Sequence, residues 1–188
     1  MNLFDRVRNI LVTPRTEWPR IAGEPATPQS IYVGYVMLLA AIGPLAILIV
    51  SGGALIFSAL IAYIVALAMT YVVALIVDSL ATTFGGERNF VQSLKLTAYS
   101  YTAAWIAGVF HLVPAIGPVL VLVAAIYAWY TFYLGVPVMK NVPREKALGY
   151  TIVVVICAIV LGLVTAGLVA AVIRGGALGP ASLLGYPR

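Results

Sequence analysis

Charge is scarce in this sequence: 9% of its 188 residues are Asp, Glu, Lys or Arg, against roughly 25% in ordinary soluble domains. A single cysteine excludes a disulfide framework, and a single histidine leaves no cluster for a metal site or a histidine-based triad. Only six residues are acidic and Asp78 is the one acid within the long apolar stretches, so paired-carboxylate catalysis there lacks material. We therefore predict no enzyme activity, no catalytic residue, no cofactor and no metal site.

Apolar residues are abundant instead, at 63% of the chain. The stretch 54–80 contains one charged residue, Asp78, and as a helix it would be about 40 Å long, more than a bilayer core requires. Four further stretches have a similar character. The sequence predicts an all-α polytopic membrane protein, a bundle of five transmembrane helices at 31–50, 54–80, 92–112, 116–138 and 148–173, preceded by a short amphipathic helix.

The basic residues indicate the orientation of these spans. Five crossings would leave only Arg174 and Arg188 on one side of the membrane, and would place on the other side Arg6, Arg8, Arg15, Arg20, Arg88, Lys95, Lys140, Arg144 and Lys146. By the positive-inside rule the N-terminus is cytoplasmic and the C-terminus external, in a cell inner (cytoplasmic) membrane. The expected organisation is a cytoplasmic amphipathic N-terminal segment at 1–30, a five-span domain at 31–173 and a short external tail at 174–188.

The segment 3–12 has its apolar residues at helical spacing and is too short to span. A basic amphipathic helix of this kind favours the anionic lipid surface, with docking of a partner protein as the alternative. Trp18, a few residues later, is interpreted as an interfacial anchor. The bases are spread along the chain rather than gathered on one face, so no nucleic-acid partner is expected.

Start and stop signals divide the chain further. Thr27-Pro28 and Asn89 followed by Gln92 are typical helix starts, the second as a capping box. Gly43-Pro44 predicts a kink in the first span. Gly135 and Pro137 predict the end of the fourth span.

Small residues recur every fourth position in the second and last spans. The candidate helix-packing residues are Ala62, Ala66, Ala158, Gly162 and Ala166. Small residues at this interval let helix backbones approach closely in lipid. They are expected to serve packing within the bundle or self-association into a homo-oligomer.

Asp78 and Lys95 form the candidate polar pair, at similar depth on either side of a short glycine turn. Ionisable groups at such depth usually face protein or water. A salt bridge that fastens the hairpin is one interpretation, a proton- or ion-coupling site is the second, and two separate snorkelling side chains are the third. Tyr99, Tyr130 and Tyr133 form a candidate aromatic cluster, since some rings near the ends of the spans must face the bundle.

Four segments carry a family resemblance: the end of the second span at 78–86, SLKLTAYS at 93–100, YTFYLGVP at 130–137 and KALGY at 146–150. Together they resemble the Yip domain family, in its compact bacterial form. The resemblance covers nearly the whole chain. It implies a five-span protein of the kind that, in eukaryotes, resides in early secretory membranes and binds Rab-type GTPases largely through long cytoplasmic N-terminal regions. Here about thirty residues precede the first span.

Two function classes follow. The first is a non-enzymatic scaffold, or a membrane-organising or trafficking-type protein, that contacts lipid and an unidentified membrane-protein partner. The second is a small oligomeric transporter or channel that uses Asp78 and Lys95 at a polar cavity.

Overall fold

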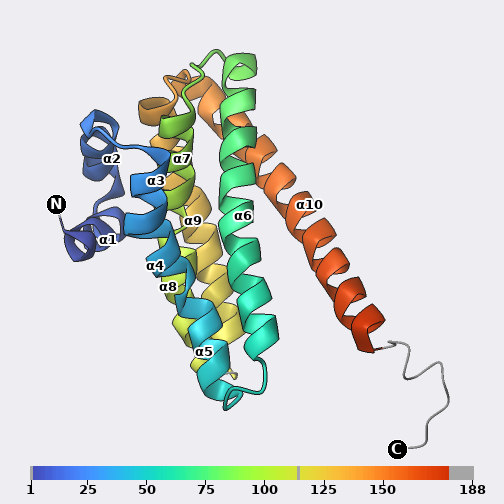
Figure 1. Cartoon of the computed structure of the whole chain (residues 1–188). Coiled ribbons are helices and arrows are strands. Elements are labelled where there is room, and N and C mark those ends of the chain that lie inside the picture. The colour runs from blue at the N-terminus through green and yellow to red at the C-terminus, as the bar shows by residue number, and fades with distance from the viewer. Residues whose placement is uncertain (1, 114, 178–188) are drawn as a thin grey trace, which may run out of the picture. The chain divides into compact units, whose positions relative to one another are not determined.

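The structure, a computed structural model, is all-α and describes residues 2–113 and 115–177, with side chains described up to residue 171 (Figure 1). Contacts divide the chain into two units, Met1–Val154 and Val155–Arg188. Four helical segments are long and apolar enough to cross a membrane: Pro28–Val50, Ile56–Phe84, Gly117–Met139 and Arg144–Ala171. The chain is a multi-span membrane protein with four candidate spans, where the sequence predicted five.

Two short helices come first, α1 (Leu3–Val12) and α2 (Pro14–Gly23). Asn2 caps α1 by accepting a hydrogen bond from the amide of Asp5, and Pro14 opens α2, where a missing amide hydrogen costs nothing. The helix α2 packs against α9 of the bundle. Trp18 is 0% exposed, so its prediction as an interfacial anchor is wrong.

The first span is not one regular helix. It consists of α3 (Pro28–Ile31), the π-helical turn η1 (Tyr32–Val36), α4 (Met37–Ala40) and α5 (Ile42–Val50). The predicted helix start at Thr27 is confirmed, since its hydroxyl accepts from the amide of Ser30. The interruption at Ala41 precedes Pro44, which cannot donate a hydrogen bond to the previous turn.

The second span is α6 (Ile56–Ala81), extended by the 3-10 turn η2 (Thr82–Phe84). Gly85 then adopts a φ of 79° and reverses the chain. The predicted third span, 92–112, is divided into α7 (Phe90–Ser100), α8 (Thr102–Ala107) and the 3-10 segment η3 (Gly108–Leu112). The first span has similar breaks and is still a candidate span, so what separates this segment from the four is its lower hydropathy, since Gln92, Lys95 and several hydroxyl side chains lie within it.

The remaining helices are α9 (Gly117–Met139) and α10 (Arg144–Ala177). The helix α9 ends at Met139, one residue after the predicted end of the fourth span, with Gly135 and Pro137 in its last turns. The last helix begins at Arg144, four residues before the predicted start of its span. The predicted tail at 174–188 lies outside the described residues except for 174–177, which continue α10.

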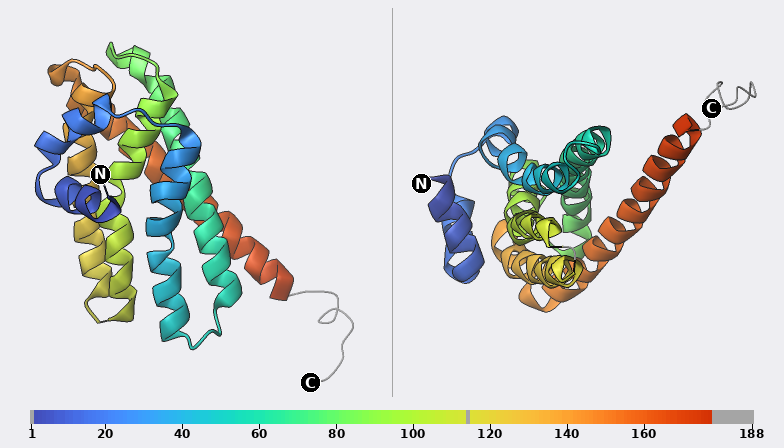
Figure 2. Two further views of the ribbon diagram at one scale, coloured as in Figure 1. Left: turned by 60° about the vertical axis from the view of Figure 1, so that its left-hand side comes forward. Right: turned by 90° about the horizontal axis from the view of Figure 1, so that it is seen from below.

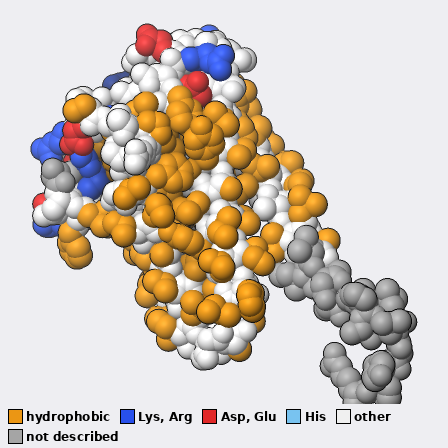
Figure 3. Space-filling model, viewed as in Figure 1, with side chains coloured by type: hydrophobic (Ala, Val, Ile, Leu, Met, Phe, Trp, Pro, Cys, Tyr) orange, Lys and Arg blue, Asp and Glu red, His pale blue; other side chains and the backbone are white. Residues whose placement is uncertain are grey.

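Within the first unit, α7 and α8 lie along α9, and α6 packs against both α5 and α7 (Figure 2). The core between these helices includes Val36, Ala74, Leu94 and Ala98, each buried. Figure 3 shows acidic and basic side chains gathered around α1 and α2 and at the turn between α6 and α7, with a largely apolar face elsewhere on this unit. The charged side chains on this face thus lie around the N-terminal helices and at the end of the bundle where α6 turns into α7.

Candidate functional site

Asp78, near the end of α6, is the centre of a polar cluster that joins two loops. Its Oδ1 accepts hydrogen bonds from the amide of Asn89 at 2.8 Å, the hydroxyl of Ser93 at 3.0 Å and the ammonium of Lys140 at 3.0 Å. Its Oδ2 lies 3.5 Å from Nε of Arg88. We call Asp78, Arg88, Asn89, Ser93 and Lys140 the aspartate cluster. It satisfies a buried carboxylate with two cations and two neutral donors.

Lys140 begins the loop between α9 and α10 and joins that loop to the aspartate cluster. It is 1% exposed, and its ammonium also donates to the carbonyl of Asn89 at 3.2 Å. Burial lowers the pKa of Lys140, and the hydrogen bond with Asp78 opposes that effect. The carbonyl of Lys140 accepts from the amide of Glu87 at 2.9 Å. A Cβ at Gly86 would lie 2.6 Å from that carbonyl oxygen, so only glycine fits between the loops.

A second cluster fastens the N-terminal helices to the bundle. Arg6 is 5% exposed and forms ion pairs with Glu17 at 2.5 Å and with Glu24. Its guanidinium also lies 5.6 Å from the ring centroid of Tyr99. The ammonium of Lys95 donates to the carbonyls of Ile21 and Glu24. These residues, Arg6, Glu17, Glu24, Lys95 and Tyr99, are called the arginine cluster.

Trp18 adds an apolar contact to the polar contacts by which the arginine cluster holds the N-terminal helices to the bundle. Its indole nitrogen donates to the carbonyl of Thr131 at 3.0 Å, and its ring occupies the space left by Gly135, where a Cβ would lie 2.6 Å from Trp18 Cε2. The tyrosine hydroxyl of Tyr127 on α9 donates to the carbonyl of Leu11 at 2.7 Å. The helix α2 therefore packs on α9, while α1 contacts α2 and α8 and keeps Phe4 and Val12 exposed. That the amphipathic segment 3–12 lies on the lipid surface stays a prediction.

The structure separates the predicted pair of Asp78 and Lys95. Among the described residues the ion-pair partners of Asp78 are Lys140 and Arg88, whereas Lys95 belongs to the arginine cluster. The two residues lie on neighbouring helices, and Ser93 on α7 supplies the contact to Asp78 that Lys95 was expected to make. The predicted depth of Asp78 in the membrane correctly indicated that it pairs with a cation, but it did not identify Lys140 as that cation.

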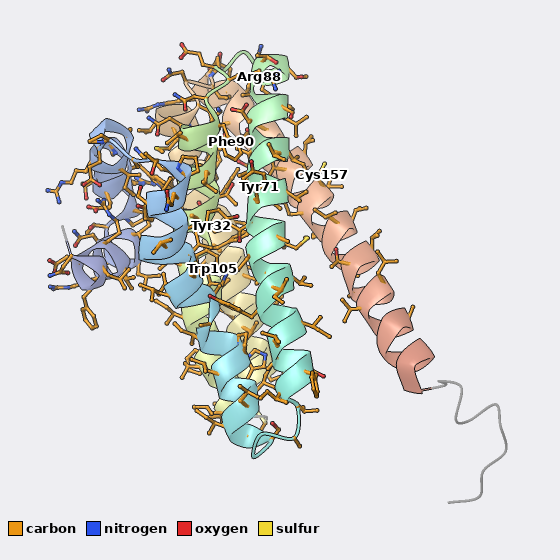
Figure 4. The ribbon with its side chains drawn as sticks, in the orientation of Figure 1. Tyr32, Tyr71, Arg88, Phe90, Trp105 and Cys157 are labelled. Carbon is orange, nitrogen blue, oxygen red and sulfur yellow. The ribbon has the colours of Figure 1, made fainter. Side chains whose placement is uncertain are left out.

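Aromatic rings connect the same end of the bundle from helix to helix. Tyr71 on α6 lies between Tyr32 at 6.4 Å and Phe90 at 5.1 Å, measured between ring centroids (Figure 4). Figure 4 also shows Arg88 at the turn next to Phe90. These rings thus link η1, α6 and α7.

With this arrangement described, comparison with known families is informative. A family model described as the Yip1 domain matches residues 8–166. The chain belongs to the Yip1 domain family. No curated protein and no solved structure matches it. Members of this family are multi-span membrane proteins that are generally non-enzymatic and are linked to membrane trafficking.

The match includes the whole aspartate cluster and all of the arginine cluster except Arg6. One part of the site in this Yip1 domain had a signal in the sequence that was not used, and another part had none. Pro14, Trp18 and Ile21 follow helical spacing and are all buried, which is the pattern of a packed helix face rather than of an interfacial anchor. For Lys140 no local signal exists, because 62 residues separate it from Asp78.

The small residues predicted to form packing surfaces between helices are only half-buried or exposed in the structure. In the first unit, Ala62 is exposed and Ala66 is half-buried. In the second, Ala158 and Gly162 are half-buried and Ala166 is exposed, and a Cβ at Gly162 would meet no described atom within 4 Å. A close approach of two helical backbones lies elsewhere in this Yip1 domain, where a Cβ at Gly108 would be 2.7 Å from Cα of Gly43.

The three candidate tyrosines are also placed in different surroundings. Tyr99 packs against Tyr35 at 4.5 Å between centroids, while Tyr130 is 43% exposed and lies 5.9 Å from Tyr127. Tyr133 lines a separate surface pocket with Arg15 and others. Over the part of the chain that the structure describes, no group of three or more His, Cys, Asp or Glu side chains could hold a metal ion.

Proposed function

We propose that this Yip1 domain protein is a non-enzymatic membrane scaffold that organises lipid and other membrane proteins, including further copies of itself. The enclosure of Asp78 carries the proposal. A transport site requires an ionisable group that its ion can reach, whereas both oxygens of Asp78 face protein cations or donors. The ammonium of Lys95 is likewise held by two backbone carbonyls. The polar groups therefore support a fastening role.

We also propose that the segment 90–112 crosses the membrane, which makes five spans with a cytoplasmic N-terminus. This segment begins at the turn after α6, and its last part, η3, packs against α5. The end of α5 leads into the turn at 51–55, at the opposite end of α6. The bases support the orientation, since Arg88, Lys140 and Arg144 fall in the turns on the N-terminal side.

Cysteine labelling tests the five-span arrangement. In a Cys157→Ser background, single cysteines at Ala54 and Ile116 should react with an impermeant maleimide added outside intact cells, because both positions are exposed in turns on the external side. Cysteines at Glu87 and Glu145 should react only after the membrane is opened. Labelling of Ile116 from the same side as Glu87 would contradict a crossing by 90–112.

Reconstitution in liposomes distinguishes a scaffold function from a transporter function. In liposomes the protein should produce no proton, sodium or potassium flux above that of protein-free vesicles. Energy transfer between labelled copies should rise with protein density and should fall in Ala62→Leu and Gly162→Leu, because bulk at these outward-facing small residues would hold the helices of neighbouring copies apart. Val160→Leu adds bulk outside the small-residue positions and should leave the transfer unchanged. A flux that disappears in Asp78→Asn at unchanged thermal stability would overturn the proposal.

A further inference from the structure

A surface pocket of about 420 Å³ lies where α9 ends and α10 begins, beside the start of α2. Its lining combines two arginines with a tyrosine and apolar side chains: Arg15, Tyr133, Leu134, Pro137, Val138 and Arg144. The arginines come from different helices, so the pocket exists only when the N-terminal helices are packed on the bundle. All of these residues belong to the first unit.

The two arginines are free of acidic partners. Arg6, Arg20 and Arg88 form ion pairs with carboxylates, but among the described residues no carboxylate lies within 4.0 Å of Arg15 or Arg144, and both are exposed. A planar guanidinium matches the oxygens of a phosphate, and two of them on one small pocket create a site for an anion.

An apolar path leads from this pocket along the membrane-facing side of α9. A neighbouring pocket of about 330 Å³ shares Arg15 and is lined also by Tyr127 and Tyr130. Beyond it the exposed side chains of α9 are apolar: Val119, Leu122, Val123 and Ile126. Because α9 is a candidate span, this path would lie in contact with hydrocarbon.

We propose that this pocket binds the headgroup of an anionic phospholipid, with the phosphate between Arg15 and Arg144 and the acyl chains along α9. An acidic peptide would satisfy the arginines but not the continuous apolar path, and a free phosphate would leave that path unused. The position of the pocket at the end of a span is the depth of lipid headgroups. The site thus selects a lipid by charge and holds it by apolar contact.

Retention of lipid by the full-length protein tests this site. The protein is reconstituted in nanodiscs of equal parts phosphatidylglycerol and phosphatidylcholine, released into detergent, and examined by native mass spectrometry. Phosphatidylglycerol should be retained in preference, and the Arg15→Gln/Arg144→Gln variant should lose that preference on the order of tenfold, since each basic group near an anionic lipid strengthens binding severalfold. Arg8→Gln removes an exposed charge outside the pocket and should change the preference less than twofold.

A second variant separates loss of the pocket from loss of the fold. Val138→Trp should fill the pocket while both arginines remain, and it should lower phosphatidylglycerol retention without changing the thermal stability. An equal loss in Arg8→Gln would show general surface attraction and overturn the proposal. So would unchanged retention in Val138→Trp, displacement of the lipid by millimolar inorganic phosphate, or displacement by a poly-glutamate peptide.

Discussion

Replacement of Lys140 by methionine should destabilise the protein by about 3–5 kcal/mol, the range observed when one partner of a buried ion pair is removed. Methionine fills similar volume, so the loss reflects the carboxylate of Asp78, which would lose its most deeply buried cation. The loop at 140–143 would also lose its hydrogen bond to Asn89. Thermal unfolding in detergent, followed by circular dichroism, measures the effect.

A double-mutant cycle assigns this loss to the pair. Asp78→Asn should recover part of the stability lost in Lys140→Met, because a neutral amide is easier to bury than an unpaired carboxylate. The same change should not rescue Lys95→Met, since Lys95 contacts the carbonyls of the N-terminal segment. Lys146→Met, an exposed change in the same region, serves as the control. Coupling of Asp78 to Lys95 instead of Lys140 would contradict the aspartate cluster.

Replacement of Gly135 by leucine should detach the N-terminal helices from α9. Even a Cβ at this position would lie 2.6 Å from both Trp18 and Leu96, so a leucine side chain must expel the indole. Loss of a buried tryptophan from its site costs about 3–5 kcal/mol. Trypsin should then cleave after Arg15 and Arg20 much faster than in the unchanged protein, with the Trp fluorescence shifted to longer wavelength if the indole meets water.

Two further variants make this result specific. Gly149→Ala adds a methyl group inside α10 at an ordinary contact distance of 3.5 Å from Phe84, so it should leave cleavage unchanged and slightly favour the helix. Trp18→Ala combined with Gly135→Leu should lose little beyond Gly135→Leu alone, because both changes remove the same contact. Slow cleavage in Gly135→Leu would show that Trp18 is not what holds α2.

Local signals in the sequence were sufficient for much of the fold. Long apolar runs identified the four candidate spans, and the caps at Thr27 and Asn89 were recognised because a capping side chain bonds an amide only a few residues away. Even there the detail differed. The side-chain amide of Gln92 donates to the carbonyl of Ala22, and the backbone amide of Asn89, from which Gln92 was expected to accept, donates to Asp78 instead.

The site depended on contacts between distant residues, and these could not be predicted from one sequence. Asp78 was singled out because a carboxylate in an apolar span is costly, yet any of several bases at the same membrane side could have paired with it. Trp18 was misjudged because an amphipathic side chain suits either an interface or a glycine-lined recess. Gly135 lies 117 residues after Trp18 in the sequence, and only the folded chain places the two side by side.

The long separation between Asp78 and Lys140 also matters while the chain is being made. The carboxylate and its buried cation are 62 residues apart, so at about 5–20 residues per second Asp78 is synthesised roughly 3–12 s before Lys140. During that interval Arg88 and Ser93 are the nearby partners already present. Asp78 is therefore incompletely neutralised until α9 and the loop that carries Lys140 have been made, and only then is its charge balance complete.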